Sequence, residues 1–331
     1  HCKADVIFCA PDNRELLDTV LANSGLNPIV IPLPPEGAPI WPDKCTASSP
    51  QMIPIPNRGT PGILIYTSGT TGNPKGVVLS HGNLLAAGNN PVQAHDITKD
   101  DAGLCVLPIY HINGLCVTVM GTLVSASQLV IPYKFSVSTF WQQVYENHVT
   151  WFSAVPTLFA YLLNDETEPK LNRKRLRFSR SASAPLSPEI HRRFEARFGI
   201  PIIETMGLTE TGAQILSNPM PPAQRKIGSP GKAVGNEIMI ACDDLSPATT
   251  GQSGEILVRG DNVMQEYLHQ PEETAKTITS GGWLRTGDIG HIDKDGFVFV
   301  TGRIKELIIK GGENIAPREI DEVLLEHNTI L

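Results

Sequence analysis

A run of hydroxyl residues, glycines and one lysine has the composition of a phosphate-binding loop. It reads Thr67-Ser68-Gly69-Thr70-Thr71-Gly72-Asn73-Pro74-Lys75-Gly76. Glycines let backbone N–H groups approach an anion closely, hydroxyls add neutral donors, and Lys75 adds a point charge suited to a phosphate oxygen. Because a glycine follows Lys75, the spacing departs from the Gly-x4-Gly-Lys-Ser/Thr pattern of common nucleoside triphosphatases. The run therefore predicts a phosphate loop of another kind.

Two carboxylates farther along the chain suit a nucleotide and its metal ion. Glu210 ends the segment Met206-Gly207-Leu208-Thr209-Glu210, just beyond a predicted strand, where open α/β sheets place ligand-binding loops. Mg²⁺ binds through one or two carboxylates together with substrate phosphates, so Glu210 is a candidate ligand. Asp288, in Thr286-Gly287-Asp288, is predicted on a tight turn, where it would accept hydrogen bonds from paired ribose hydroxyls. Taken alone, each carboxylate is more often an ordinary surface residue.

Two further segments carry cations or a histidine. Gly302-Arg303-Ile304-Lys305 offers a guanidinium and an ammonium where the pattern of predicted strands changes. The alternative to a binding role is that these charges lie at an inter-domain surface. His111 ends Leu107-Pro108-Ile109-Tyr110-His111, after a predicted strand, and a lone histidine is more often structural than catalytic. The order of all these segments along one chain is more informative than any of them alone.

Alternating strands and helices position these segments. Apolar runs such as residues 62–66 predict strands, and helices with an apolar face lie between strands as far as residue 206. This alternation is typical of an α/β fold, a parallel sheet with helices on its faces. After Gly228, short strands separated by Gly/Asp/Ser turns predict a β-rich subdomain, and beyond Arg303 a short strand and a helix at 317–327 follow. We therefore expect a nucleotide- and acyl-binding α/β core at 1–227, a β-rich subdomain at 228–302, and a hinge with the start of a further domain at 303–331.

Composition excludes several classes of protein. The 331 residues are 41% hydrophobic and 18% charged, with a formal net charge of −7, which is ordinary for a globular protein. The basic segment at 170–177 is interpreted as a solvated connection, so we expect no nucleic-acid partner. No stretch of about eighteen apolar residues is present, so no transmembrane segment is expected. Six scattered cysteines without a Cys-x2-Cys pair favour a reducing, cytoplasmic compartment over secretion.

The motifs, taken in order, resemble those of the adenylate-forming superfamily. They are Thr-Ser-Gly-Thr-Thr-Gly-x-Pro-Lys-Gly, Pro-x-x-His, Gly-x-Thr-Glu, Thr-Gly-Asp, Gly-Arg-x-Lys and Gly-Gly-Glu-Asn. This superfamily contains acyl-CoA synthetases, firefly luciferase and the adenylation domains of peptide synthetases. The resemblance runs from the first predicted strand to the last residue, and it implies the fold of the large N-terminal domain of these enzymes. It also implies a two-step ligation, in which a carboxylate and ATP give an acyl-adenylate and pyrophosphate, and a thiol then displaces AMP.

The resemblance implies a role for each matching residue. Thr209 would contact the α-phosphate and Glu210 would hold Mg²⁺. Asp288 and Arg303 would bind the ribose hydroxyls. His111 would stand beside the acyl pocket, and Lys305 matches the hinge about which the small C-terminal domain turns. The residues implied to hold the triphosphate are Thr67, Ser68, Gly69, Thr70, Thr71, Gly72 and Lys75.

Two departures from the family's pattern matter. Met206 stands where the family commonly has an aromatic residue that stacks on adenine; because a thioether also packs on rings, we expect Met206 and Gly207 still to bind the base. The family's C-terminal lysine, which assists adenylation, has no counterpart before Leu331, and the chain opens on His1 close to a predicted strand. We therefore expect a chain truncated at both ends whose adenylation activity is impaired.

The leading interpretation is an acyl-CoA synthetase that uses ATP, Mg²⁺, coenzyme A and a fatty or other organic acid. Residues 311–315 and 317–320 resemble the CoA-ligase branch more than the amino-acid-activating one. Residues 180–184 and 217–219 are weakly similar to oxalate-type CoA ligases, which hints at a small acid.

Other interpretations remain open. The family places the acyl pocket near residues 154–158, 181–184 and 203–207, whose depth the sequence does not define. The acyl acceptor could be the thiol of an acyl-carrier protein instead of coenzyme A. A different class of protein, a nucleotide- or acyl-adenylate-binding module without catalysis, is the second alternative.

Overall fold

The computed structural model describes residues 1–34, 54–67, 74–306, 308–310 and 313–315, with residues 317, 320 and 324. The segment Ser68 to Asn73 of the expected phosphate loop, including Ser68, Gly69, Thr70, Thr71 and Gly72, lies outside the described residues. Most of the helix expected at 317–327 does as well. The chain forms two compact units, residues 1–55 and 56–331. This division falls inside the expected 1–227 core, and the expected boundaries at 227/228 and 302/303 stay predictions.

The first unit contains a β–α–β arrangement. Strand β1 (Val6–Cys9) pairs in parallel with β2 (Ile29–Pro32), and α1 (Arg14–Ser24) joins them. Gly25 ends α1 at a φ of 67°, the left-handed conformation that glycine adopts readily at a helix C-terminus.

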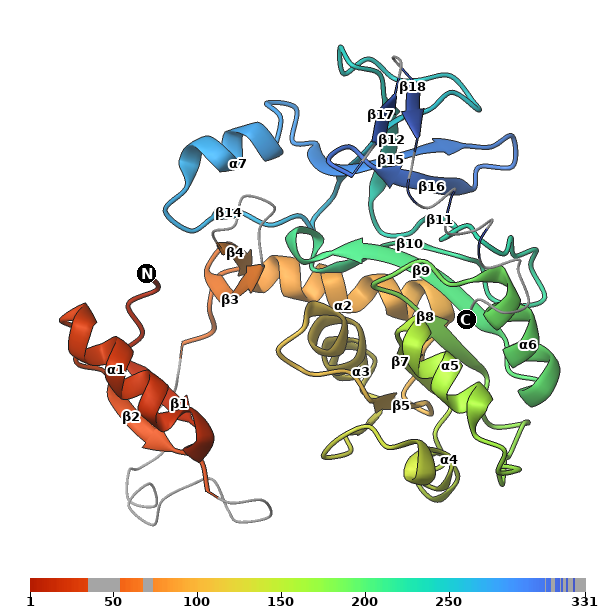
Figure 1. Ribbon diagram of the computed structural model, residues 1–331, viewed down its shortest axis with the longest axis horizontal. Coiled ribbons are helices and arrows are strands. Elements are labelled where there is room, and N and C mark those ends of the chain that lie inside the picture. Colours follow the sequence, from red (N-terminus) through yellow and green to blue (C-terminus); the bar gives the residue numbers. More distant parts are fainter. Residues whose placement is uncertain are drawn as a thin grey trace. The chain divides into compact units, whose positions relative to one another are not determined.

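A seven-stranded sheet forms the centre of the second unit, in the order β11-β10-β9-β8-β7-β5-β6 (Figure 1). The strands β5 to β9 pair in parallel, which confirms the α/β fold expected from the sequence. Strands β10 and β11 add an antiparallel edge that the sequence analysis did not predict. The strands are β5 (Ala102–Cys105), β6 (Gln128–Val130), β7 (Trp151–Ala154), β8 (Phe178–Ser181), β9 (Ile202–Leu208), β10 (Ala213–Ser217) and β11 (Lys232–Ala233).

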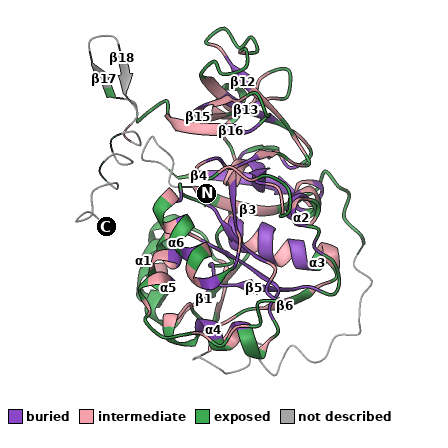
Figure 2. Ribbon diagram, turned by 90° about the vertical axis from the view of Figure 1, so that its right-hand side faces the viewer, coloured by how far each residue is buried: buried purple, intermediate pink, exposed green. Residues whose placement is uncertain are grey.

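Helices cover both faces of this sheet. On one face, α2 (His81–His95) and a π-helix (Asn113–Met120) pack their apolar residues against Trp151 and Phe178; the short α3 (Gly121–Ser125) continues the π-helix. On the other face, Phe152 and Ile202 pack against the helices α4, α5 and α6. The burial colours of Figure 2 follow this layering, with the central strands and much of α2 buried. The three helices of the second face are α4 (Val137–Glu146), α5 (Pro156–Asn164) and α6 (Pro188–Phe198).

The start of α2 follows from a local hydrogen-bond exchange. Ser80 Oγ accepts a hydrogen bond from the backbone N–H of Asn83 at 3.1 Å, and Asn83 Oδ1 accepts one from the backbone N–H of Ser80 at 2.8 Å. This reciprocal pair satisfies two donors that a helix N-terminus otherwise leaves free. Ser80 is therefore the N-cap residue of α2.

The expected phosphate loop connects the two strands of a hairpin. Strand β3 (Pro61–Thr67) pairs antiparallel with β4 (Lys75–Ser80), and Thr67 and Lys75 are register partners at its end. The short β14 (Glu266–Tyr267) pairs with the other edge of β4. This pairing brings a segment almost two hundred residues away in the chain next to Lys75.

A four-stranded antiparallel sheet follows, in the order β12-β13-β15-β16. The sequence analysis placed Thr286-Gly287-Asp288 on a tight turn, which is wrong: the segment lies within the strand β15. Gly287 has a φ of 75°, so it departs from regular strand geometry without ending the strand. The elements of this region are β12 (Glu237–Ala241), β13 (Gly254–Arg259), α7 (Pro271–Thr277), β15 (Leu284–Ile292), β16 (Val298–Arg303), β17 (Ile308–Lys310) and β18 (Glu313–Ile315).

Two observations concern the whole described part of the chain. None of its helices combines the length and apolar character needed to cross a membrane. The cysteines described, at positions 2, 9, 105, 116 and 242, are free thiols.

Candidate active site

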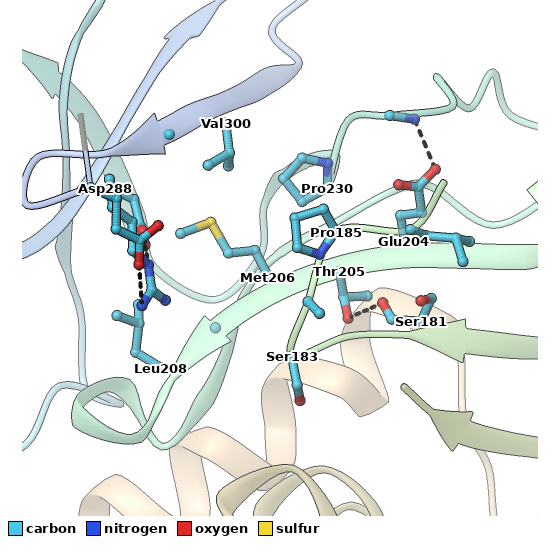
Figure 3. Close-up of a pocket in the computed structure, with 17 residues that line it drawn as sticks. Ser181, Ser183, Pro185, Glu204, Thr205, Met206, Leu208, Pro230, Asp288 and Val300 are labelled. Carbon is cyan, nitrogen blue, oxygen red and sulfur yellow. Dashed lines mark hydrogen bonds and ion pairs between the residues drawn. The ribbon is translucent and has the colours of Figure 1, made fainter. Parts of the chain in front are cut away.

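A pocket of about 380 Å³ lies where β8 and β9 end, and strand β16 supplies its opposite wall. Asp288 lies at one side of the pocket, Ser181 and Thr205 at the other, and Met206 between them (Figure 3). The lining residues are Ser181, Ser183, Ala184, Pro185, Leu186, Glu204, Thr205, Met206, Gly207, Leu208, Gly228, Pro230, Asp288, Val300, Gly302, Arg303 and Glu306.

The walls expected for the acyl pocket are reproduced only in part. The segments 181–184 and 203–207 contribute residues to this pocket. Ala154 and Leu158 instead pack into the apolar core beneath α4, α5 and α6, so the third expected wall does not reach it.

Asp288 and Arg303 form an ion pair at one side of the pocket. They are register partners on β15 and β16, and Arg303 Nε lies 3.0 Å from Asp288 Oδ1. Burial raises the pKa of Asp288 above its ordinary value, and the neighbouring guanidinium opposes this effect. The sequence analysis assigned these two residues to one task, and the structure brings them together.

Met206 and Gly207 lie between the two sides of the pocket, on strand β9. At Gly207 a Cβ atom would lie 1.7 Å from the carbonyl oxygen of Ala213 on the neighbouring strand β10. Because no side chain fits there, glycine is required by the packing of the two strands as well as by any ligand. The apolar Met206 side chain and the flat backbone beside it suit the face of an aromatic ring.

Lys75 and Glu210 meet around a third residue, Tyr267. The hydroxyl of Tyr267 donates to Glu210 Oε1 at 2.8 Å, and Lys75 Nζ lies 4.9 Å from the centroid of the Tyr267 ring. Lys75 Nζ also donates to Glu273 Oε2 at 2.8 Å, and this bond, with that from Lys276, lowers the pKa of Glu273 to about 2. Both side chains expected at the triphosphate and its metal ion therefore have protein partners in this structure.

The other expected site residues are placed less decisively. Thr209 opens the short 3-10 turn Thr209–Thr211, one residue beyond the pocket-lining Leu208. Thr67 sits opposite Lys75 in the hairpin. His111 precedes the π-helix and packs its ring against Tyr110, outside the lining of the 380 Å³ pocket. Lys305 follows β16, outside the lining of the pocket.

Glu210 is the candidate metal ligand of this region, since the other carboxylate there, Glu273, pairs with Lys75. Across the described ranges, no group of three or more His, Cys, Asp or Glu side chains could hold a metal ion by itself. Glu210 thus fits an ion such as Mg²⁺ that takes most of its ligands from phosphates and water, and it does not fit a resident structural metal.

Two buried charged clusters beside the pocket were missed by the sequence analysis. The first, called the Glu204 cluster, comprises Glu204, His191, Glu195 and Arg225. His191 on α6 contacts Glu204 through Nδ1 at 2.9 Å and Glu195 through Nε2 at 3.0 Å. An imidazole that donates at both nitrogens is protonated, and these bonds raise the pKa of His191 although its burial opposes them.

Hydrogen bonds lower the pKa of Glu195 in the same cluster. Burial of this carboxyl raises its pKa, but bonds from His191, Arg225 and the backbone N–H of Ile202 outweigh burial and bring the pKa to about 2. With two carboxylates, one imidazolium and one guanidinium, the Glu204 cluster is neutral overall.

The second cluster, called the Arg180 cluster, comprises Arg180, Ser153, Thr205 and Gln214. The guanidinium donates to Ser153 Oγ at 3.0 Å, to Thr205 Oγ1 at 3.0 Å and to Gln214 Oε1 at 2.6 Å. Arg180 lies in the segment 180–184, whose weak similarity to oxalate-type CoA ligases is given above, but the sequence did not indicate its burial or its partners. A charged residue on a predicted strand or helix ordinarily lies at the surface, so the Glu204 cluster carried no signal. Tyr267 and Glu273 carried no signal either, because their partners are remote in the chain.

Comparisons with known proteins agree with this geometry. The model of the family described as "AMP-binding enzyme" matches residues 1–268. A sulfoacetate–CoA ligase of Cupriavidus necator is 47% identical over 333 residues, which cover 100% of this chain and 65% of that protein.

Solved structures give the same result. MatB from Rhodopseudomonas palustris with ATP bound superposes with a TM-score of 0.86 at 32% identity, over 96% of this chain and 63% of that one. The O-succinylbenzoate coenzyme A synthetase of Bacillus subtilis, in complex with ATP and a magnesium ion, gives 0.81 at 30% identity, over 97% and 64%. The chain thus spans less than two thirds of the length of these relatives.

Proposed function

Because the chain belongs to the AMP-binding enzyme family, we propose that it activates a carboxylic acid with ATP for transfer to the thiol of coenzyme A. In the first step a carboxylate oxygen attacks the α-phosphorus of ATP. The bond from that phosphorus to the bridging oxygen breaks, and pyrophosphate leaves with the electron pair. In the second step the thiol sulfur attacks the acyl carbon, the thiol proton is lost to base, and AMP leaves.

The observation that carries this proposal is the convergence of three remote segments on one pocket. Met206 and Gly207 come from β9, and the Asp288–Arg303 pair comes from β15 and β16. A flat apolar surface next to a buried carboxylate that can accept from two hydroxyls is complementary to a nucleoside. Glu210 continues the same chain segment toward Lys75 and Tyr267, where phosphates of a bound nucleotide would reach.

Each residue then has a limited task. Lys75 would exchange its carboxylate partner, Glu273, for a phosphate oxygen, and Thr209 would donate to the α-phosphate. Glu210 would hold Mg²⁺, which when bound neutralises charge on the phosphates. We extend the assignment of phosphate binding to Thr67, Ser68, Gly69, Thr70, Thr71 and Gly72, of His111 to the acyl side, and of Lys305 to a hinge between 1–302 and the residues that follow.

The test is equilibrium binding of a stable acyl-adenylate mimic, an acyl sulfamoyl adenosine, to the 331-residue chain. We expect it to bind at least about tenfold more tightly than AMP, because it occupies the acyl side as well as the nucleoside side. Equal affinity for the two would overturn the proposal. Tighter binding of the mimic without any acid-dependent exchange between ATP and pyrophosphate would instead support the acyl-adenylate-binding module without catalysis. Acid-dependent exchange between ATP and pyrophosphate then identifies the acid.

The acceptor and the compartment are separate parts of the proposal. Adding coenzyme A or the phosphopantetheine form of an acyl-carrier protein to the loaded enzyme distinguishes the two thiols; we propose coenzyme A, since the names of the relatives specify it. The cytoplasmic location expected from the scattered cysteines stays a prediction.

A further inference from the structure

Arg180 holds a positive charge in the protein interior without an acidic partner. Its side chain is 1% exposed, and its three hydrogen-bond partners are two hydroxyls and one amide oxygen. Its Nε has no hydrogen-bond partner in the part of the chain that the structure describes. Burial lowers the pKa of Arg180 to about 9, which still leaves the guanidinium charged at neutral pH.

Such an arrangement is unusual because buried charges are normally paired. Removing an ion from water costs several kcal/mol, and proteins ordinarily compensate this with an opposite charge close by. The Glu204 cluster, whose Glu204 precedes Thr205 on β9, shows that pattern, whereas the Arg180 cluster keeps a net charge of one. An anion from outside the protein is the simplest compensation.

The hydrogen bonds of the Arg180 cluster lead toward the pocket. One route ends at Thr205, which accepts from Arg180 and lines the pocket, but which donates its own proton to the backbone oxygen of Ser181 at 3.2 Å. The second passes through Ser153 Oγ, which donates to Asn113 Oδ1 at 3.1 Å, and Asn113 Nδ2, which donates to Ser183 Oγ at 3.3 Å. Because Ser183 Oγ accepts from Asn113, its own proton remains to be donated to an acceptor in the pocket.

Two more features indicate that this side of the pocket binds a hydrogen-bond acceptor of a ligand. Ser183 adopts a φ of 71°, a left-handed conformation that is strained for a residue with a side chain and that recurs at ligand sites. The hydroxyl of the neighbouring Ser181, another lining residue, is buried without a hydrogen-bond partner among the described residues. The carboxylate of Glu204 does not oppose an anion here, because His191 and the backbone N–H of Gly228 both donate to it.

We propose that this side of the pocket binds a second anionic group on the acid substrate, so that the enzyme acts on short dianionic acids. The inference rests on the proposed function and specifies its substrate class. The hydroxyl of Ser183, which is exposed to the pocket, contacts the second acid group, and Arg180 acts behind it as a positioning residue. The hydrogen-bond relay of Ser153 and Asn113 connects its charge to Ser183.

The experiment compares acyl sulfamoyl adenosines whose tails are isosteric but differ in charge. The succinyl mimic is paired with the 4-methylpentanoyl mimic, and the malonyl mimic with the 3-methylbutanoyl mimic, each titrated into the 331-residue chain. For at least one pair we expect the anionic member to bind about tenfold or more tightly, because the uncompensated charge of Arg180 attracts the anionic tail and not the neutral one.

Variants at Arg180 then separate charge from structure. In Arg180→Gln the ratio of the affinities for the anionic and the neutral mimic should fall to about one, while the affinity for the neutral mimic stays within about twofold. Arg180→Lys should restore part of this preference for the anionic mimic. Should Arg180→Gln fail to fold, Ser183→Ala provides the equivalent test, because this side chain is exposed to the pocket and its loss should reduce the preference severalfold.

The outcomes distinguish the two proposals. Two results overturn the dianionic class and leave the proposed function intact. One is equal affinity for the charged and neutral mimics in both pairs, and the other is an equal loss of affinity for the two mimics in the variants. Mimics that bind no better than AMP overturn both.

Discussion

Strand β9 contributes a residue to a charged cluster on each of its faces, and the two clusters differ in how their charge is balanced. On the face covered by α6, two carboxylates meet His191 and Arg225, and the charges cancel. On the face covered by α2, the guanidinium of Arg180 meets only neutral oxygens. Alternate residues of a strand point to opposite faces, so the adjacent residues Glu204 and Thr205 of β9 belong to different clusters.

The difference indicates different roles. A balanced cluster stabilises the fold only while it is complete, because removing one member leaves another charge buried and uncompensated. An unbalanced cluster is incomplete in the protein alone, and its remaining partner is expected in the ligand. Changes at the Glu204 cluster should therefore affect folding, and changes at the Arg180 cluster should affect mainly binding.

The largest expected effect is that of His191→Leu. Loss of the imidazolium leaves Glu204 and Glu195 facing each other near the core, so we expect the free energy of unfolding to fall by about 3–5 kcal/mol, measured by urea denaturation. Arg192→Ala, at the exposed neighbouring position of α6, is the control and should change it by less than about 0.5 kcal/mol. Similar effects of the two changes would contradict the comparison.

The next effect is the pH dependence of the same cluster. The pKa of Glu195 lies below its ordinary value of 4.5, so its contribution is present above pH 4.5 and is lost as the pH falls toward 2. The pKa of His191 is raised, so its contribution is complete below its ordinary value of 6.5 and is lost as the pH rises through the folded value. The stabilisation should be greatest between pH 4.5 and 6.5.

This profile is measured as the difference in unfolding free energy between the wild-type chain and Glu195→Gln from pH 2 to 8. We expect about 1–3 kcal/mol near pH 6 and almost none near pH 2. A difference that does not vary with pH would exclude the assigned ionisation.

Lys75→Ala tests a third kind of charge, one that is balanced now but exchangeable. If Lys75 leaves Glu273 for a phosphate beyond the α-position, the affinity for ATP should fall tenfold to a hundredfold and the affinity for AMP by less than about twofold. Titration calorimetry with both nucleotides gives the answer, and equal losses for ATP and AMP would contradict this role.

Arg180→Met gives the stability counterpart of the binding test. Because no buried carboxylate loses its partner, we expect a loss of only about 1–2 kcal/mol, from three oxygens left without a donor, and no change of this loss between pH 5 and 8. A loss as large and as pH-dependent as that of His191→Leu would make the two clusters equivalent.

The smallest expected effect has the opposite sign. Glu273→Gln removes the anion that competes for Lys75, so the affinity for ATP should rise about twofold to fivefold. Glu272→Gln, its exposed neighbour on α7, is the matched control and should leave ATP binding unchanged. A weaker affinity for ATP in Glu273→Gln would show that Glu273 assists binding.

The elements were more predictable than the contacts between them. Helix α6 and the parallel strands β7 and β8 follow from apolar periodicity and from proline at the first turn. Strand β10 was missed because it turns back directly after the 3-10 turn at Thr209, and no local pattern marks an antiparallel edge on a parallel sheet. The misplaced turn at Gly287 has a similar cause, since glycine can bend a strand without ending it.

The candidate site divides in the same way. The pairing of Asp288 with Arg303 agrees with the single task that the family resemblance implies for them, because each belongs to a short motif. Tyr267 and Glu273 could not be predicted as site residues, because their partners are remote in the chain. Glu273 contacts Lys75 across almost two hundred residues, and Tyr267 contacts Glu210 across about sixty. Arg180 was visible in the sequence, but its burial depends on the packing of four strands.

The left-handed backbone of Ser183 sets stability against activity. Glycine would relieve the strain at this position, so Ser183→Gly is the change that a screen for thermal tolerance should enrich. The same change removes the hydroxyl proposed to receive the substrate. A population selected first for heat resistance and then for catalysis should therefore gain the glycine and return to serine. The reverse order of selection should end with glycine, so the residue at position 183 would show which selection came last.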